Sequence, residues 1–285
     1  KEHYLNKPYG DVWNKMREMA YKHHPYKWMT IGKELKHIEE AQLQDVKNFF
    51  FKHYTPANAI LVVAGNVETD NVMQLAEKWF GPIPAGEKYV RQLPKEPAQT
   101  EARTLEIKAD VPLDAFVKTW HMASRLERGY YVTDLISDIL GGGASSRLYE
   151  ALIKEKKLFS SIECYHFGSI DNGLLAIEGK LVKGVNIDDA HKAVNEEVEK
   201  MKTELVDEKE LQKVINKTES TILFEDMSVM SRANSLAYYE LLGDAELMND
   251  ELQRYQSITA QELLDESKKI FDEKNSNTLY YLSQN

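Results

Sequence analysis

Cysteine is almost absent from this sequence, which has a single one, Cys164, in 285 residues. One thiol excludes an intrachain disulfide and a zinc site built from several cysteines. Long apolar runs are absent as well: no stretch of about 18 apolar residues occurs, so the sequence predicts no membrane span. The compartment stays open, because cysteine-poor proteins occur on both sides of a membrane.

Positive charge is in deficit. The 36 Lys and Arg residues are outnumbered by 46 Asp and Glu residues, which gives a formal net charge of -10. A surface of this sign repels phosphate groups, so we expect no nucleic-acid partner. Hydrophobic residues still make up 42% of the chain, enough for a packed core, and the length suffices for two domains of ordinary size.

Motifs for a self-sufficient active site are also missing. HExxH and its inverse, HxxEH, do not occur, and none of the eight histidines forms a pair at helical spacing with an adjacent acid. Isolated histidines such as His37, or the pair His23-His24 in a Pro-Tyr loop, are far more often solvated residues than metal ligands. No serine has a GxSxG context, and Cys164 has no neighbour that would make its thiol reactive. The residues alone therefore predict no catalytic centre.

The most distinctive pattern is a helix–glycine–helix corner, in the stretch RGYYVTDLISDILGGGASSRLYEALIKEKKLFSSI. Apolar residues three and four apart predict a helix from Arg128 to Leu140, Gly141–Gly143 end it, and a second helix is expected over 145–156. Backbone amides after the glycines suggest a phosphate cradle. The segment lacks the GK[ST] ending and the GxGxxG pattern, so a structural corner packed on a sheet is the favoured interpretation.

The remaining sequence predicts a mixture of helices and strands. Prolines gather in 83–102, which we expect to be a linker. The strands on either side of 168–173 are expected to pair antiparallel. Helices are predicted over 11–21, 42–52, 69–80, 187–204, 207–242 with a bend near 226–228, and 259–271. Strands are predicted over 59–64, 103–109, 115–122, 159–167, 174–181 and 278–282.

The chain contains a weak internal repeat. A shift of 217 residues places Gln42 on Thr259 and Asn58 on Asn275. Both copies consist of a helix, an Asn-containing turn and an apolar strand. Because the second copy begins near 103, the first would begin before Lys1, and we expect it to lack its opening sheet and helix pair.

Two segments resemble a known family. HYTPANAILVVAGNVETDNVMQLAEKWFGPIPAG (53–86) and LISDILGGGASSRLYEALIKEKKL (135–158) resemble the inverted-zincin metallopeptidase superfamily of pitrilysin and insulysin, in its short bacterial, mitochondrial-processing-peptidase-like form. This implies an α+β fold with two related α/β halves, antiparallel sheets faced by helices, and an incomplete first half. The expected division is 1–82 for the end of the catalytic-type half, 83–102 for the linker and 103–285 for the complete substrate-facing half.

The resemblance also implies zinc in the parent protein. In this superfamily HxxEH on a helix of the first half and a distal glutamate hold the metal, and the glutamate of HxxEH is the general base. This chain lacks HxxEH, so we expect it to bind no metal and to contain no catalytic residue. The distal glutamate is expected shortly before Lys1; Glu2 is the nearest candidate, in the wrong register.

Substrate-binding positions follow from the same resemblance. An arginine and a tyrosine, seven residues apart after the SRL segment, reach the substrate from the second half in members of the superfamily. The matching positions here are Ile153 and Ser160, and neither side chain can donate a charge-assisted hydrogen bond. These two degenerate positions are the candidate substrate-binding residues, with Lys154 and Phe159 as compensating neighbours after a one-residue shift.

The leading hypothesis is a bacterial zinc metalloendopeptidase that degrades peptides in a chamber between two halves, with this chain inactive alone. The alternative, suggested by Ile153 and Ser160, is a non-catalytic chamber or partner subunit. Both imply peptide substrates and leave a homodimer, or a heterodimer with a second family subunit, open. The compartment stays undecided between bacterial cytoplasm and periplasm. A third hypothesis, an unrelated α/β binding module, requires the internal repeat to be coincidental.

Overall fold

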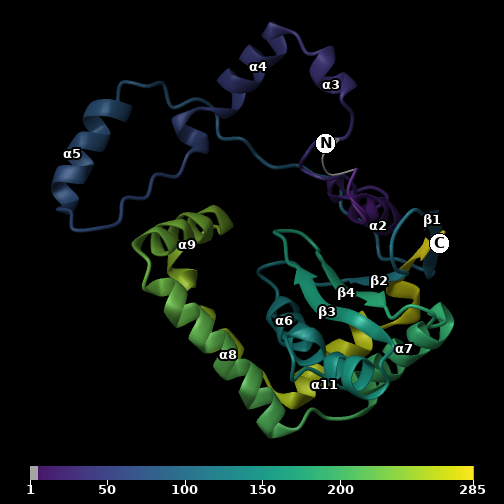
Figure 1. Cartoon of the computed structure of the whole chain (residues 1–285). Coiled ribbons are helices and arrows are strands. Elements are labelled where there is room, and N and C mark those ends of the chain that lie inside the picture. The colour runs from purple at the N-terminus through teal and green to yellow at the C-terminus, as the bar shows by residue number, and fades with distance from the viewer. Residues whose placement is uncertain (1–5, 285) are drawn as a thin grey trace. The chain divides into compact units, whose positions relative to one another are not determined.

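The computed structural model describes residues 6–284, which form two compact units. Unit 1 comprises the described residues up to Ile31, together with Pro94–Lys217 and the chain from Arg254 onward. Unit 2 comprises Gly32–Leu93 and Thr218–Gln253. Helices and antiparallel strands occur together, so the predicted α+β class is confirmed (Figure 1).

Unit 1 is built on a five-stranded sheet with the order β1-β5-β2-β4-β3. Strands β2, β3, β4 and β5 pair antiparallel, whereas β1 pairs parallel with β5. The strands are β1 (Arg103–Ala109), β2 (Ala115–His121), β3 (Phe159–Phe167), β4 (Leu174–Leu181) and β5 (Ser276–Ser283). All five were predicted, including the antiparallel β3–β4 pair. The central strands β2, β4 and β5 are almost wholly buried, because both faces of the sheet are covered.

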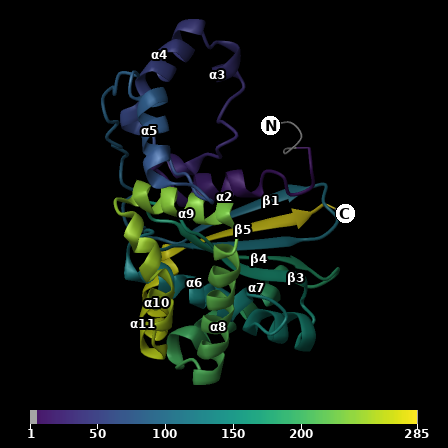
Figure 2. The same cartoon turned by 90° about the vertical axis from the view of Figure 1, so that its left-hand side faces the viewer.

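Three helices cover one face of this sheet: α6 (Arg128–Gly141), α7 (Ile187–Thr203) and α11 (Ala260–Ile270). Helix α2 (Val12–Ala20) packs on the opposite face, against β2 and β5 (Figure 2). Its buried Val12 and Met16 join Val117, Leu279 and Tyr281 in one apolar cluster. Successive residues of a strand point to opposite faces. Val117 therefore faces α2, whereas its neighbour Phe116 contacts the ring of His191 on α7.

The predicted long helix over 207–242 is two helices, as its expected bend indicated. Helix α8 (Glu208–Asp226) ends next to Met227, and Ser228 caps α9 (Val229–Leu242) by accepting a hydrogen bond from the backbone N–H of Ser231. The short helices nearby are η4 (Ala245–Asp250) and α10 (Glu251–Gln256).

Unit 2 contains α3 (Lys36–Glu39), α4 (Leu43–His53), the 3₁₀ turn η2 (Pro56–Asn58) and α5 (Thr69–Phe80). The prediction of a buried strand over 59–64 is wrong. This segment has no strand geometry, and Leu61 and Val63 are exposed by 59% and 48%. A β-strand forms only when a neighbour completes its ladder of hydrogen bonds, and none of the described strands pairs with 59–64.

The internal repeat is confirmed at the level of local structure. Adding 217 to the bounds of α4, 43 and 53, gives 260 and 270, the bounds of α11. The same shift carries η2 onto η5 (Glu273–Asn275). Both helices begin with a capping box, and in both copies the turn asparagine donates to a carbonyl at the end of the preceding helix. In the second copy β5 follows, whereas 59–64 in the first stays unpaired.

The helix predicted over 145–156 takes a different form. Residues Tyr149–Glu155 (η3) form a π-helix, and Lys157 ends it with a left-handed φ of 52°. Leu158 then donates its backbone N–H to the carbonyl of Leu152. A π-helix is wider than an α-helix and is commonly found at functional sites. Residues 84–100, between α5 and β1, form neither helix nor strand.

Candidate functional site

The glycine corner is a point of close contact between a helix and a strand. A Cβ atom on Gly141, at the end of α6, would lie 1.9 Å from the backbone nitrogen of Cys164 on β3. Only glycine permits this approach. Gly143 has a φ of 114°, which turns the chain away from the helix. The corner therefore brings the end of α6 onto β3, in agreement with the structural interpretation of the glycines.

Strand β3 is irregular beside this corner. Its pairing with β4 shifts register between Phe159 and Ser161, so Ser160 is an extra residue at a bulge. Ser160 is exposed, and its hydroxyl donates to the carbonyl of Lys180 at 3.0 Å. Bulges change the direction of side chains at the edge of a sheet, and β3 is an edge strand here.

The corner, the π-helix and the bulge enclose a cavity of about 310 Å³, which we call the corner pocket. Ile153 from the π-helix and Ser160 from β3 both line it, so the structure brings the two candidate substrate-binding positions together. Tyr149, Glu163 and Tyr165 also line it and were not identified from the sequence. The alternation of Glu163 and Tyr165 along β3 was the available signal, since residues two apart share a face of a strand.

The polar groups around the corner pocket are not arranged for catalysis. Burial raises the pKa of the Cys164 thiol, so the sulfur stays protonated and is a poor nucleophile. Burial and the neighbouring Glu178 carboxylate also raise the pKa of Tyr165, whose hydroxyl donates to Glu178 at 2.5 Å. The pocket offers a ligand apolar contact, exposed hydroxyls and one carboxylate, that of Glu163. No cation is among its lining residues.

Within residues 6–284 no group of three or more His, Cys, Asp or Glu side chains has the geometry of a metal site. Three histidines of unit 1 are engaged separately: His24 with Asp171, His166 with Asp134, and His121 with the carbonyl of Ala20. The described residues therefore do not fit a zinc ion, and no metal-dependent step is derived from them. Glu2 lies outside the described residues.

No helix in the part of the chain that the structure describes is both long and apolar enough to cross a membrane.

Comparison with known proteins identifies the class of this architecture. This fold, a sheet faced by helices, is that of solved M16-type peptidases. The chain belongs to the peptidase M16 family: residues 40–218 match the profile described as "Peptidase M16 inactive domain".

The relatives agree with this assignment. The chain is 25% identical over 278 residues to the zinc protease PqqE of Helicobacter pylori, covering 96% of the chain and 62% of that protein. A crystal structure of a protease from Helicobacter pylori superposes with a TM-score of 0.88 at 25% identity, over 98% of this chain and 68% of that one. An 87-residue stretch is 30% identical to the mitochondrial-processing peptidase subunit beta of Saccharomyces cerevisiae, covering 30% of the chain and 19% of that protein.

The chain spans 62% to 65% of the length of three curated zinc-protease relatives, which come from Helicobacter pylori, Rickettsia felis and Bacillus subtilis.

Proposed function

We propose that this chain serves a bacterial zinc metalloendopeptidase as its non-zinc, substrate-facing half, joined to the last elements of the zinc-bearing half. The observation that carries the proposal is the match of 40–218 to an inactive domain whose relatives are named zinc proteases. In this proposal 1–82 belong to the zinc-type half, 83–102 link the halves and 103–285 form the second half. The segment pairs α4–η2 and α11–η5, with their identical spacing, support two related halves.

The corner pocket is the proposed peptide-facing site of this half. Ile153 and Ser160 line the same cavity, although they come from different elements. Their side chains supply apolar contact and a hydroxyl in place of the arginine and tyrosine of the family pattern. The proposed contribution of this half to binding is therefore shape and apolar contact, without a charge-assisted hydrogen bond.

Zinc belongs to the whole protein in this proposal. When bound, the metal supplies an activated water for peptide hydrolysis. The residues of this chain would hold and orient the peptide.

A peptidase assay on the purified chain tests the proposal. A fluorogenic unfolded protein substrate would be incubated with the 285-residue chain, with and without a chelator and with added zinc. We expect no chelator-sensitive cleavage and no stoichiometric zinc in elemental analysis. Cleavage that disappears with chelator and returns with zinc would mean that this chain holds a complete active site, contrary to the proposal.

The second candidate function is a non-catalytic chamber or partner subunit, and the residues at 153 and 160 favour it. In some proteins of this superfamily the zinc site and the substrate-binding residues lie on two different chains. One relative of this chain carries the name of such a subunit, the mitochondrial-processing peptidase subunit beta. The coding sequence directly before Lys1 distinguishes the two functions. An HxxEH motif followed by a distal glutamate supports the enzyme, whereas a degenerate motif supports the subunit. Light scattering of the full protein would measure whether it forms a homodimer or needs a second chain.

A further inference from the structure

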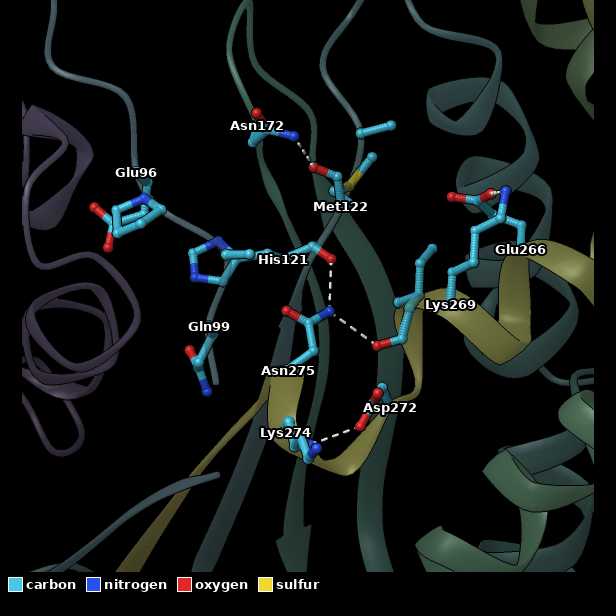
Figure 3. A pocket seen from close by; sticks show the side chains of 14 residues that line it. Glu96, Gln99, His121, Met122, Asn172, Glu266, Lys269, Asp272, Lys274 and Asn275 are labelled. Carbon is cyan, nitrogen blue, oxygen red and sulfur yellow. Dashed lines mark hydrogen bonds and ion pairs between the residues drawn. The ribbon is translucent and has the colours of Figure 1, made fainter. Parts of the chain in front are cut away.

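A second cavity lies in unit 1, away from the residues of the corner pocket. It has a volume of about 500 Å³, and we call it the amide pocket after Asn172 and Asn275, which line it (Figure 3). Its other walls are the extended segment around Glu96, the end of β2 at His121 and the end of α11. Segments far apart in the sequence thus meet around it. The proposed function uses none of these residues.

The two asparagines that line this cavity have their amide nitrogens engaged, which leaves the side-chain oxygen of each as an acceptor. Asn275 donates through Nδ2 to the carbonyls of His121 and Ile270, both at 2.9 Å. Asn172 donates through Nδ2 to the carbonyl of Met122 at 3.0 Å. These bonds fix the orientation of each amide, since only the nitrogen can donate. Neither Oδ1 accepts a hydrogen bond from the described residues, and Figure 3 shows the Asn275 oxygen directed away from the two carbonyls that the nitrogen contacts.

The internal repeat provides a comparison for Asn275. Its counterpart, Asn58, also donates to the end of the preceding helix, at the carbonyl of Lys52. However, the Oδ1 atom of Asn58 accepts the backbone N–H of Tyr89 at 2.5 Å. In the same local turn, the asparagine Oδ1 atom therefore accepts a hydrogen bond in the first copy but accepts none from the described residues in the second. This difference indicates that the Asn275 oxygen is available to a ligand.

His121 adds a third acceptor. Its Nε2 atom lies 3.0 Å from the carbonyl of Ala20, and a carbonyl can only accept, so Nε2 carries the hydrogen. Burial lowers the pKa of His121 below its usual 6.5, and this outweighs the opposing effects of the Ala20 contact and Glu96. The ring is therefore neutral at pH 7, and its Nδ1 is an acceptor.

The charges around the cavity favour a cation. Three carboxylates line it, those of Glu96, Glu266 and Asp272. Glu96 accepts three backbone N–H groups, those of residues 22, 23 and 24, each at 2.8 Å, which keep it ionised. Glu266 is only 14% exposed, whereas its partner Lys269 is 73% exposed and therefore largely screened by water. Lys274 is the other lining cation, so the formal sum of the lining charges is -1, from three carboxylates and two ammonium groups.

We propose that the amide pocket binds a protonated primary amine. An ammonium group has three donors and no acceptor, which matches a lining of amide oxygens and a neutral imidazole. An anion would meet lone pairs and a lining in which three carboxylates outnumber two ammonium groups. A lysine side chain and a free peptide N-terminus share this chemistry; that a peptide carries the amine rests on the proposed function, whereas recognition of the amine does not.

Direct binding to the 285-residue chain tests the inference without peptidase activity. Calorimetry would compare Nα-acetyl-lysine N-methylamide, alaninamide and the neutral Nα-acetyl-norleucine N-methylamide. We expect saturable binding of at least one amine, with chemical-shift changes at the side-chain amides of Asn172 and Asn275, and none with the norleucine compound. A preference for the lysine compound identifies the side chain as the source, and a preference for alaninamide identifies the N-terminus. Equal binding of the norleucine compound, or no binding of either amine, would overturn the inference.

Two substitutions at one position separate charge recognition from structural damage. Asn172→Asp and Asn172→Lys both replace the amide that donates to Met122, so a change common to both reports structural damage and opposite changes report the charge. The added carboxylate should tighten amine binding by about threefold, the scale of an exposed ion pair, and the added ammonium should abolish it. Asn58→Asp in unit 2 is the matched control and should leave binding unchanged. If Asn172→Asp and Asn172→Lys change the affinity alike, the amide pocket does not recognise the charge of the ligand.

Discussion

At the residue scale, the chain that lines the corner pocket contains a strained backbone conformation at Lys157. Lys157 occupies a left-handed conformation directly after the π-helix, with a φ of 52°. A residue with a Cβ atom is destabilised there by roughly 1–2 kcal/mol relative to glycine. This side chain is exposed, so no packing contact explains the choice. The strain is located where the chain passes from Ile153 to Ser160.

Replacing Lys157 by glycine should therefore stabilise the protein. We expect Lys157→Gly to raise the free energy of unfolding by about 0.5–1 kcal/mol, since part of the relieved strain is offset by the greater entropy of glycine in the unfolded chain. Urea unfolding followed by circular dichroism measures it. Lys156→Gly is the control: Lys156 has a helical φ of -78°, so glycine there should lower stability by about 1 kcal/mol. Equal effects of the two substitutions would contradict the explanation.

The chemistry of the corner pocket can be changed at Ile153 and Ser160, the two positions that cannot donate a charge-assisted hydrogen bond. The double variant Ile153→Arg/Ser160→Tyr adds a guanidinium and a phenol to a pocket that has no lining cation. We expect it to bind a fluorescein-labelled unstructured peptide about tenfold more tightly than the unmodified chain, because a hydrogen bond to a charged group contributes about 1.5 kcal/mol or more. Fluorescence anisotropy measures the affinity.

The matched control for that variant adds no hydrogen-bond donor to the pocket. Ile153→Met/Ser160→Ala preserves apolar volume and adds no polar group, so its affinity should equal that of the unmodified chain. If both double variants bind the peptide equally, the corner pocket is not in contact with it, and the assignment of Ile153 and Ser160 as peptide-facing residues is wrong.

At the element scale, a buried polar network holds α6 to β3 and α10. Asp134 of α6 lies 3.1 Å from Nδ1 of His166 on β3 and accepts the hydroxyl of Tyr255 at 2.6 Å. Nε2 of His166 is 3.2 Å from the hydroxyl of Tyr130. Burial alone would raise the pKa of Asp134, but the His166 and Tyr255 hydrogen bonds and the nearby Arg125 charge outweigh it, so the pKa is lowered.

This lowered pKa predicts the pH dependence of the contact. A carboxyl whose pKa is lower in the folded chain stabilises the fold above its usual value of 3.8, and that contribution is lost as the pH falls through the folded pKa. Asp134→Asn should cost about 2 kcal/mol at pH 7, because the charge-assisted bonds are lost. The difference from the unmodified chain should shrink below pH 3.8.

Unfolding by urea at a series of pH values measures both effects. Asp138→Asn is a suitable control, because burial raises the pKa of Asp138, so its contribution has the opposite pH trend. A cost of Asp134→Asn that is the same at pH 7 and in acid would show that the carboxylate charge does not hold the elements together.

The sequence predicts the strands of unit 1 and the bend between α8 and α9, but not the π-helix. The strands of unit 1 were predicted because apolar runs such as β4 pack between two layers, and the bend between α8 and α9 because polar residues interrupt the periodicity. The π-helix was not predicted, because its apolar residues suit an α-helix equally well. The pairing of Ile153 with Ser160 in one pocket came from the family pattern; the role of Glu163 needed coordinates.

At the scale of the whole molecule, the two copies of the repeat differ in what covers them. Leu263 on α11 is fully buried, whereas its counterpart Val46 on α4 is 59% exposed. Leu279 on β5 is likewise fully buried between two strands, while 59–64 has no ladder partner among the described strands. The same local pattern, a helix, an Asn-containing turn and an apolar segment, therefore produces a strand only when other strands lie beside that segment. This explains why the strand predicted over 59–64 is absent, whereas the strand predicted over 278–282 is present as β5.

Hydrogen exchange distinguishes these two copies directly. We expect the backbone amides of residues 60–63 to exchange about as fast as those of an unstructured chain, because no ladder bonds protect them. The amides of residues 277–280, which lie between β1 and β2, should be protected by the stability of the sheet. Mass spectrometry of peptic fragments after brief deuteration, repeated at several protein concentrations, measures both. Equal protection of the two segments at all concentrations would mean that 59–64 forms a strand within this chain.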